Sequence, residues 1–235
     1  SFAYPEAGEN VLTDISFKAK KGQTIAVIGS TGSGKSTLIN LIPRYYDVTK
    51  GSVKVDGVDV RDMTQKELRD KLGYVPQKGV LFSGTIDSNI RYGKPEITDA
   101  QVKEAAEVAQ ATEFIDTKPE KYESPVSQGG TNVSGGQKQR VAIARAIAKD
   151  PEIFIFDDSF SALDFKTARQ LRKALKEYTK DATTVIVAQR ISTILGADQI
   201  IVLDDGHMAG IGTHKELMAN CEVYQQIARS QLSEE

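Results

Sequence analysis

Three continuous apolar runs, Ile25–Ile28, Ile153–Phe156 and Val185–Ala188, predict buried β-strands. A run without polar interruption is typical of a strand that is covered on both faces, as in a parallel sheet. Other stretches repeat apolar residues at helical spacing, and these residues include Val102, Ala105, Ala106 and Ala109, and later Ala168, Leu171, Leu175 and Tyr178. Strands that alternate with helices predict an α/β fold with a mainly parallel sheet core.

Two reverse turns, Asp56-Gly57 and Asp204–Gly206, predict antiparallel pairs. A turn of this kind between short apolar stretches favours a β-hairpin. The flanking stretches are Val53–Val55 and Val58–Val60 at the first turn, and Ile200–Leu203 and His207–Ile211 at the second. Phe2–Tyr4 and Val11–Phe17 predict two further strands near the N-terminus.

Polar caps predict where several helices begin and end. In a capping box the first side chain accepts from the amide three residues on, and the later side chain reaches back. The matching pairs are Thr98 with Gln101 and Thr213 with Glu216. A further helix is predicted from Ser134 to Lys149, and Asp150-Pro151 ends it.

Composition and charge narrow the classes of function. The 235 residues carry a net charge of −2, so no global basic field indicates nucleic-acid binding. The lone Cys221 excludes an intramolecular disulfide and favours a reducing compartment. No apolar run approaches the roughly 18 residues of a membrane helix, and no signal peptide is visible. Because the sequence starts at Ser1 without Met and already predicts a strand, we expect a soluble piece of a longer protein.

The sequence GSTGSGKST at Gly29–Thr37 fits the pattern G-x-x-x-x-G-K-[ST] of a P-loop, or Walker A motif. Its glycines let backbone N–H groups face phosphate oxygens, and a helix begins where the loop ends. Lys35 can reach the phosphates, and Ser36 offers a hydroxyl to Mg²⁺. A flexible Gly/Ser turn is the alternative, but the apolar strand before the loop and the apolar helix positions after it favour the P-loop. The predicted nucleotide-binding residues are Ser30, Thr31, Gly32, Ser33, Gly34, Lys35, Ser36 and Thr37.

Two further stretches carry chemistry. Asp157 and Asp158 end the strand at Ile153–Phe156, and ligands bind at the carboxyl ends of strands in open α/β sheets. Asp157 is placed to orient Mg²⁺ through its water shell, although an acidic pair can also simply cap a turn. Ser134-Gly-Gly-Gln137 begins a helix with a hydroxyl and two glycines, which predicts a second phosphate site. An ordinary serine N-cap is the alternative there.

These motifs, in this order, resemble those of the ATPase domains of ABC transporters, and the resemblance covers essentially the whole chain. Ser134, Gly135, Gly136 and Gln137 are similar to the LSGGQ signature, with Val133 in the leucine position. The sequence of Val80–Ile86 is similar to that of exporter subunits in particular. Three other motifs match at Gln77 of the Q-loop, at Ser161 and Asp164 of the D-loop, and at Tyr4, the aromatic residue that stacks on adenine. For Tyr4, plain strand core is the alternative.

The resemblance implies the P-loop NTPase fold of the ABC ATPases over residues 1–235. It implies an antiparallel β-subdomain over about residues 1–60, a helical subdomain over about 85–150, and a RecA-like core from the remainder. It also implies ATP and Mg²⁺ as cofactors. Ser36 and Gln77 would then ligate the metal directly, and Asp157 would do so through water. In the family two such domains face each other head to tail, so each signature completes the ATP site of the other domain.

Two positions depart from the pattern of the family. The catalytic glutamate is Asp158 in this chain, and the switch histidine is Gln189. Aspartate is one methylene shorter, which withdraws the carboxylate by roughly 1 Å, and such an error can cost about 100-fold in rate. Glutamine donates a hydrogen bond but carries no positive charge. A third departure is Ser127-Gln128, where exporters usually have Gly-Glu in a segment that faces the membrane domains.

The predicted function is therefore that of the degenerate half of a heterodimeric ABC exporter. The chain would hold MgATP, hydrolyse it poorly, and lend its signature to a partner domain with the consensus Glu and His. It would work with transmembrane domains at the cytoplasmic face of the cell membrane. A fully active ABC ATPase subunit is the first alternative. A soluble chromosome-maintenance ATPase head is disfavoured, because the segment Lys78–Val133 between Q-loop and signature lacks heptads, and a P-loop kinase would not explain the signature.

Overall fold

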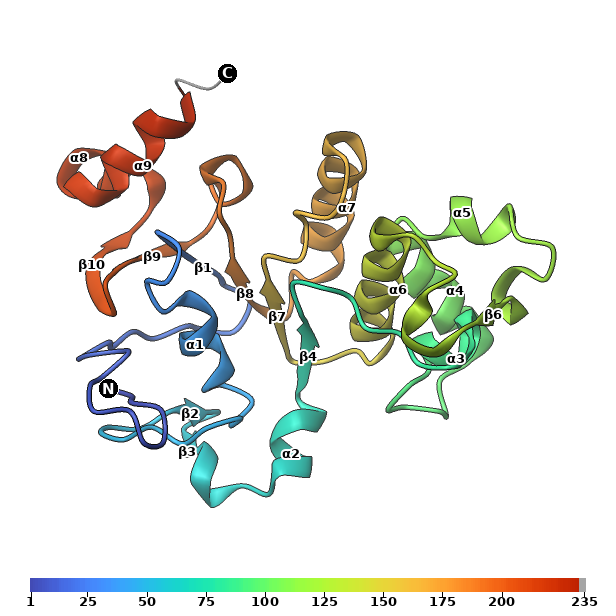
Figure 1. Ribbon diagram of the computed structural model, residues 1–235, viewed down its shortest axis with the longest axis horizontal. Coiled ribbons are helices and arrows are strands. Elements are labelled where there is room, and N and C mark those ends of the chain that lie inside the picture. The colour runs from blue at the N-terminus through green and yellow to red at the C-terminus, as the bar shows by residue number, and fades with distance from the viewer. Residues whose placement is uncertain (233–235) are drawn as a thin grey trace. The chain divides into compact units, whose positions relative to one another are not determined.

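The computed structural model describes residues 1–232, and the contacts within the chain divide it into two compact units (Figure 1). The first unit comprises Ser1–Leu72 and the chain from Thr183 onward. The second unit comprises Gly73–Ala182. Within residues 1–232, no helix combines the length and the apolar character that are needed to cross a bilayer.

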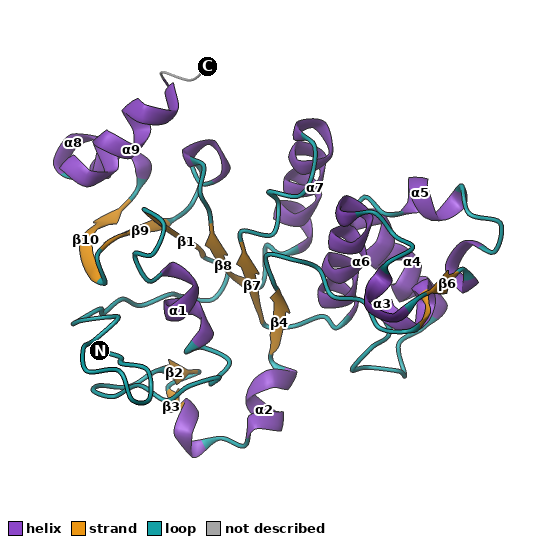
Figure 2. Ribbon diagram, viewed as in Figure 1, coloured by secondary structure: helices purple, strands orange, loops and turns teal. Residues whose placement is uncertain are grey.

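The first unit is built around four strands in the order β10-β9-β1-β8 (Figure 2). The central strand β1 (Thr24–Gly29) runs parallel to β8 (Thr183–Val187) on one side and to β9 (Gln199–Asp204) on the other. The edge strand β10 (His207–Gly212) pairs with β9 in the antiparallel sense. Ile25–Ile28 are fully buried, as the continuous apolar run predicts.

Helices and one small hairpin complete the first unit. The predicted hairpin at Asp56-Gly57 is confirmed, because both residues have left-handed φ angles of 52° and 78°, as its two-residue turn requires. The predicted capping box of Thr213 and Glu216 is also confirmed. The elements are α1 (Lys35–Asn40), β2 (Lys54–Val55), β3 (Val58–Asp59), α2 (Gln65–Asp70), α8 (His214–Asn220) and α9 (Glu222–Leu232).

The strand predicted at Val11–Phe17 is wrong. Only Leu12 pairs there, in an isolated antiparallel bridge to Phe2, and no ladder continues beyond it. The physical reason lies at Asp14, whose φ of 50° is left-handed and turns the backbone out of an extended conformation. From Thr13 to Phe17 the side chains still alternate between partly buried and exposed, as in a strand.

The second unit carries two neighbouring strands and most of the long helices. Strand β7 (Ile153–Asp157) lies beside β4 (Leu72–Val75), which begins at the boundary of the units. The helices α4 and α6 pack against each other (Figure 2). The other bounds are β5 (Gly84–Thr85), α3 (Ile86–Ile90), α4 (Asp99–Val108), α5 (Thr112–Asp116), β6 (Pro125–Val126), α6 (Gly135–Ala148) and α7 (Phe165–Tyr178).

The sequence predicted the boundaries of α6 and α4. Ser134 is the N-cap of α6 and Lys149 is its C-cap, and Asp150 then leaves the helix with a φ of 52°. Thr98 caps α4 through the predicted box with Gln101. Mostly parallel strands with intervening helices make an α/β fold, so the predicted mainly parallel sheet core is confirmed.

Candidate functional site

The loop between β1 and α1 has the backbone that its glycines predict. Gly32 and Gly34 take left-handed φ angles of 80° and 102°, which other residues adopt only with strain. There is no room for a side chain at Gly29, because a Cβ there would lie 2.2 Å from the carbonyl oxygen of Leu203. The hydroxyl oxygen of Ser33 is buried and has no hydrogen-bond partner among residues 1–232. A buried polar atom without a partner is costly, so a bound group that supplied one would be stabilised.

Lys35 lies across the mouth of this loop. Its ammonium donates hydrogen bonds of 2.8 Å to the carbonyl oxygens of Gly29 and Ser30. The side chain is therefore held over the loop rather than extended into solvent. The positive charge and the loop amides consequently belong to the same small surface, where an anion would meet both.

The N-terminal segment and a distant turn support the loop. A Cβ on Gly34 would lie 2.6 Å from Leu12 Cδ2, so the loop rests directly on that side chain. The amide of Gly206 donates to the carbonyl oxygen of Ser33, at 3.1 Å. The carbonyl oxygen of Gly206 in turn accepts from the amide of Thr13, at 2.8 Å. Segments that are far apart in the sequence thus fix the conformation of the loop.

Tyr4 is attached to the same region. Its hydroxyl hydrogen-bonds the hydroxyl of Thr37 at 2.8 Å, and its ring packs edge-on against Phe2 and Tyr46. The side chain is only partly buried. Tyr4 therefore contributes to a small aromatic cluster and keeps an accessible ring surface beside the helix that follows the loop.

Gln189 is exposed just after β8, and its backbone is held by a residue that the sequence analysis missed. Gln231 on α9 donates from Nε2 to the carbonyl oxygen of Gln189, at 2.6 Å, and accepts at Oε1 from the amide of Ile191, at 2.8 Å. One side chain thus holds the backbone at both Gln189 and Ile191. No local signal marks Gln231, because its partners lie about 40 positions away in the sequence.

In the second unit, the carboxylates predicted at the end of β7 have distinct environments. Asp157 is buried as the last residue of the strand. Asp158 is half-buried and has a left-handed φ of 48°. The amide Nε2 of Gln77 donates to Asp158 Oδ2 at 3.2 Å, although the two residues are 81 positions apart. The structure therefore brings together the predicted Q-loop glutamine and the predicted catalytic position.

The D-loop residues Ser161 and Asp164 have local roles. Ser161 Oγ donates to the carbonyl oxygen of Asp158, at 3.0 Å. Asp164 caps α7 by accepting from the amide and the hydroxyl of Thr167. These hydrogen bonds, that from the Thr167 amide foremost, hold the pKa of the Asp164 carboxyl below its usual value.

Ser134 to Gln137 form a reciprocal capping box at the start of α6. The hydroxyl of Ser134 accepts from the amide of Gln137, and the side chain of Gln137 accepts from the amide of Ser134, both at 3.3 Å. Ser134 is therefore the N-cap of α6, as the alternative interpretation of this residue predicted. Gly135 is exposed, and no atom of another element lies within 4 Å of a Cβ built on it, so packing within residues 1–232 does not explain why this position lacks a side chain.

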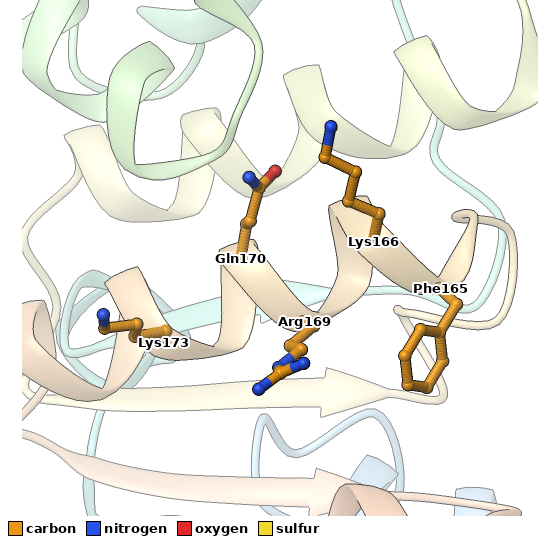
Figure 3. A pocket seen from close by; sticks show the side chains of 5 residues that line it. All are labelled: Phe165, Lys166, Arg169, Gln170 and Lys173. Atoms are coloured by element: carbon orange, nitrogen blue, oxygen red, sulfur yellow. The ribbon is translucent and has the colours of Figure 1, made fainter.

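A cavity of about 430 Å³ runs along α7. Figure 3 shows Phe165 and Arg169 on one side of the helix, with Lys166 and Gln170 projecting from another. Its lining includes three cations and no carboxylate. None of the residues predicted to bind nucleotide or metal lines this cavity.

The donors within each unit, taken separately, have the chemistry that a magnesium nucleotide requires. Serine hydroxyl, glutamine amide and carboxylate oxygens are the hard ligands that Mg²⁺ prefers, usually together with phosphate oxygens. In the first unit Ser36 offers a hydroxyl oxygen, and in the second unit Gln77 offers an amide oxygen and Asp157 a carboxylate. The orphaned hydroxyl of Ser33 and the ammonium of Lys35 suit phosphate oxygens.

The glycine loop between a buried strand and a helix defines the class of P-loop nucleoside triphosphatases. The family model described as ABC transporter matches residues 12–161, so the chain belongs to the ABC transporter family.

Similar proteins share this assignment. The chain is 49% identical over 234 residues to an uncharacterised ABC transporter ATP-binding protein of Mycobacterium tuberculosis. The match covers 98% of this chain and 40% of that protein. It is 48% identical over 218 residues to a Bacillus subtilis protein named as a candidate multidrug export ATP-binding/permease protein, with 93% and 38% covered. A solved bacterial Atm1-family ABC exporter with ATP bound matches with a TM-score of 0.93 at 39% identity, over 98% of this chain and 40% of that one. The chain thus spans about 40% of the length of these relatives.

Proposed function

We propose that this chain is the ATP-binding domain of a heterodimeric ABC exporter, and that its own site holds MgATP while hydrolysing it slowly. The observation that carries the proposal is the pair of residues at the two positions next to the γ-phosphate in the family. Asp158 stands at the position of the catalytic glutamate, and Gln189 stands at that of the switch histidine. The remaining ATP-binding features follow the family pattern, so binding is retained while chemistry is weakened.

The roles of the other residues follow from the same proposal. The Walker A residues Ser30–Thr37 and Lys35 in particular would hold the phosphates, and the ring of Tyr4 would stack on adenine. Ser36 and Gln77 would ligate Mg²⁺, with Asp157 acting through water. The metal would neutralise charge on the phosphates. The accessible ring of Tyr4 beside Thr37 and the loop-bound ammonium of Lys35 support these assignments.

The proposed partners are a second nucleotide-binding domain with the consensus Glu and His, and transmembrane domains that place this chain at the cytoplasmic face of the membrane. An exposed aromatic pair in the second unit supports the second partner. The rings of Phe82 and Tyr92 stack with centroids 4.3 Å apart, and both are substantially exposed. The guanidinium of Arg145 lies under both rings, and burial lowers its pKa to about 10. Exposed aromatic clusters of this kind mark protein contact surfaces.

A direct experiment on the purified chain tests the proposal. We expect calorimetry to detect MgATP binding, and single-turnover assays to detect very slow hydrolysis, because aspartate is one methylene shorter than the glutamate that the family uses to activate water. The Lys35→Ala variant, prepared in parallel, measures contaminating ATPase activity. Rapid turnover that exceeds this background would exclude an impaired site and favour a fully active ATPase subunit.

The head-to-tail arrangement predicts that a bulky residue at Gly135 impairs the other domain's site. A Cβ at residue 135 has no atom of another element of residues 1–232 within 4 Å, so own-site ATP binding should be unchanged in Gly135→Leu. Turnover at the partner's site in the assembled heterodimer should fall about 10- to 100-fold, because a misplaced signature displaces the reacting groups there. Gly135 is a cleaner target than Ser134, since losing the N-cap hydroxyl would itself cost about 1 kcal/mol of helix stability.

Gly196→Leu is the matched control, because Gly196 is also exposed and a Cβ there also has no atom within 4 Å. It should leave both sites unchanged. Loss of ATP binding in the Gly135→Leu chain alone, with normal turnover at the partner's site, would refute the head-to-tail arrangement.

A further inference from the structure

The amide of Gln77 faces Asp158 in one defined orientation. Its Nε2 donates to Asp158 Oδ2 at 3.2 Å. An ionised carboxylate can only accept, so the nitrogen of the amide must face it and the oxygen Oε1 must face elsewhere. The contact therefore selects between the two flipped orientations of the Gln77 side chain, which a solvent-exposed glutamine would otherwise populate freely.

The backbone on the N-terminal side of Gln77 is anchored from two elements. Ser159 Oγ donates to the carbonyl oxygen of Val75, at 2.8 Å, in a buried contact. The Nε2 of Gln139, which is fully buried on α6, donates to the carbonyl oxygen of Pro76, at 2.9 Å. The carbonyl oxygens of both residues that precede Gln77 are therefore held in place.

Close packing also fixes the backbone after Gln77. A Cβ on Gly79 would lie 2.8 Å from the carbonyl oxygen of Lys138 on α6, so only glycine fits there without movement. The guanidinium of Arg145 then donates to the carbonyl oxygen of Val80, at 2.9 Å. The Q-loop backbone is thus held against α6, and the orientation of the Gln77 amide depends on its side-chain contact with Asp158.

The backbone of Asp158 is set independently of any ligand. Its φ of 48° lies in the left-handed region, where aspartate is among the few residues other than glycine that occur often. The hydroxyl of Ser161 donates to its carbonyl oxygen at 3.0 Å, and the amide of Ser161 does so at 3.4 Å. The carboxylate is therefore aimed at Gln77 by the turn on which it sits.

We propose that Asp158 is a positioning residue for the metal ligand Gln77: it fixes the amide so that Oε1 is presented to the Mg²⁺ of the bound nucleotide. This inference rests on the proposed function, in which Gln77 ligates the metal of MgATP. It assigns the acid at this position to nucleotide retention rather than to cleavage. Partners that orient a metal ligand in this way typically contribute about 10- to 100-fold to metal affinity.

The proposal and simple charge repulsion predict opposite changes in ATP affinity when the carboxylate of Asp158 is removed. If Asp158 acted only as a negative charge near the phosphates, its removal would strengthen ATP binding. If it orients Gln77, its removal weakens the part of ATP binding that depends on Mg²⁺ and leaves metal-free binding nearly unchanged. The ratio of ATP affinities with Mg²⁺ and with a chelator therefore separates the two roles.

The test measures this ratio by calorimetry for the wild-type chain and for Asp158→Ala and Asp158→Asn. We expect Asp158→Ala to reduce the Mg²⁺-dependent gain about 10-fold. Asparagine keeps an oxygen that accepts from Gln77, so Asp158→Asn should stay within about 3-fold of wild type. Gln77→Ala should show a loss similar to that of Asp158→Ala, and the double variant should lose no more than either single change.

An unchanged or increased Mg²⁺-dependent gain in Asp158→Ala would overturn the proposal, as would a loss in Asp158→Asn equal to that in Asp158→Ala. Either result would leave the proposed function standing, because the wild-type chain would still bind MgATP. Failure of the wild-type chain to bind ATP with or without Mg²⁺ would instead remove the proposed function, and this inference with it.

Discussion

Replacing Lys35 by alanine should abolish MgATP binding at this site under conditions in which the wild-type chain is saturated. The ammonium is the one charge that the loop itself holds over its amides, through 2.8 Å bonds to the carbonyl oxygens of Gly29 and Ser30. Hydrogen bonds between charged groups contribute about 1.5–3 kcal/mol each, so an affinity loss of about 100-fold or more is expected. Calorimetry with MgATP measures this loss directly.

Lys21→Ala is the matched control for this prediction, because Lys21 is an exposed lysine in the turn that precedes β1. It should bind MgATP as the wild type does. Thermal unfolding without nucleotide checks that the Lys35→Ala variant still folds. Adding MgATP should raise the unfolding midpoint of the wild type and of Lys21→Ala, but not that of Lys35→Ala. Binding by Lys35→Ala within about 3-fold of wild type would show that the loop does not hold phosphate as proposed.

Restoring both consensus residues, by Asp158→Glu together with Gln189→His, should raise turnover at this site about 10- to 100-fold in the assembled heterodimer. Glutamate extends the carboxylate by roughly 1 Å, a displacement that can change rates by about 100-fold. Histidine restores a side chain that can carry a proton near the phosphates. The backbone at residue 189 should be unaffected, because its contact to Gln231 uses the carbonyl oxygen and not the side chain.

The measurement is steady-state ATPase activity in a heterodimer whose other site has been inactivated. Each single substitution serves as a control. It should raise ATPase activity less than the double substitution does, because the two groups act on the same phosphate. The glutamate must also adopt the left-handed backbone of Asp158, which costs roughly 1 kcal/mol, so a modest loss of stability is expected. A folded double variant without any gain in turnover would show that these two positions do not limit hydrolysis here.

The sequence by itself determined the parts of this protein that depend on neighbours along the chain. The loop at Gly29–Thr37 is flanked by a buried strand and a helix, as its pattern predicts. The boxes at Thr98 and Thr213 cap their helices, and Asp56-Gly57 turns a hairpin. These features were predictable because the groups that satisfy each backbone donor, or permit each φ angle, lie within about four residues.

The tertiary structure alone decided how distant groups meet. The contact of Gln77 with Asp158 spans 81 positions, and that of Gln231 with Gln189 spans 42, so no local pattern encodes either. The sequence predicted a strand at Val11–Phe17, yet the left-handed turn at Asp14 leaves only the bridge at Leu12. Side-chain orientation at a site depends on which segments the folded backbone brings within hydrogen-bonding distance, and periodicity along one segment carries no information about the other.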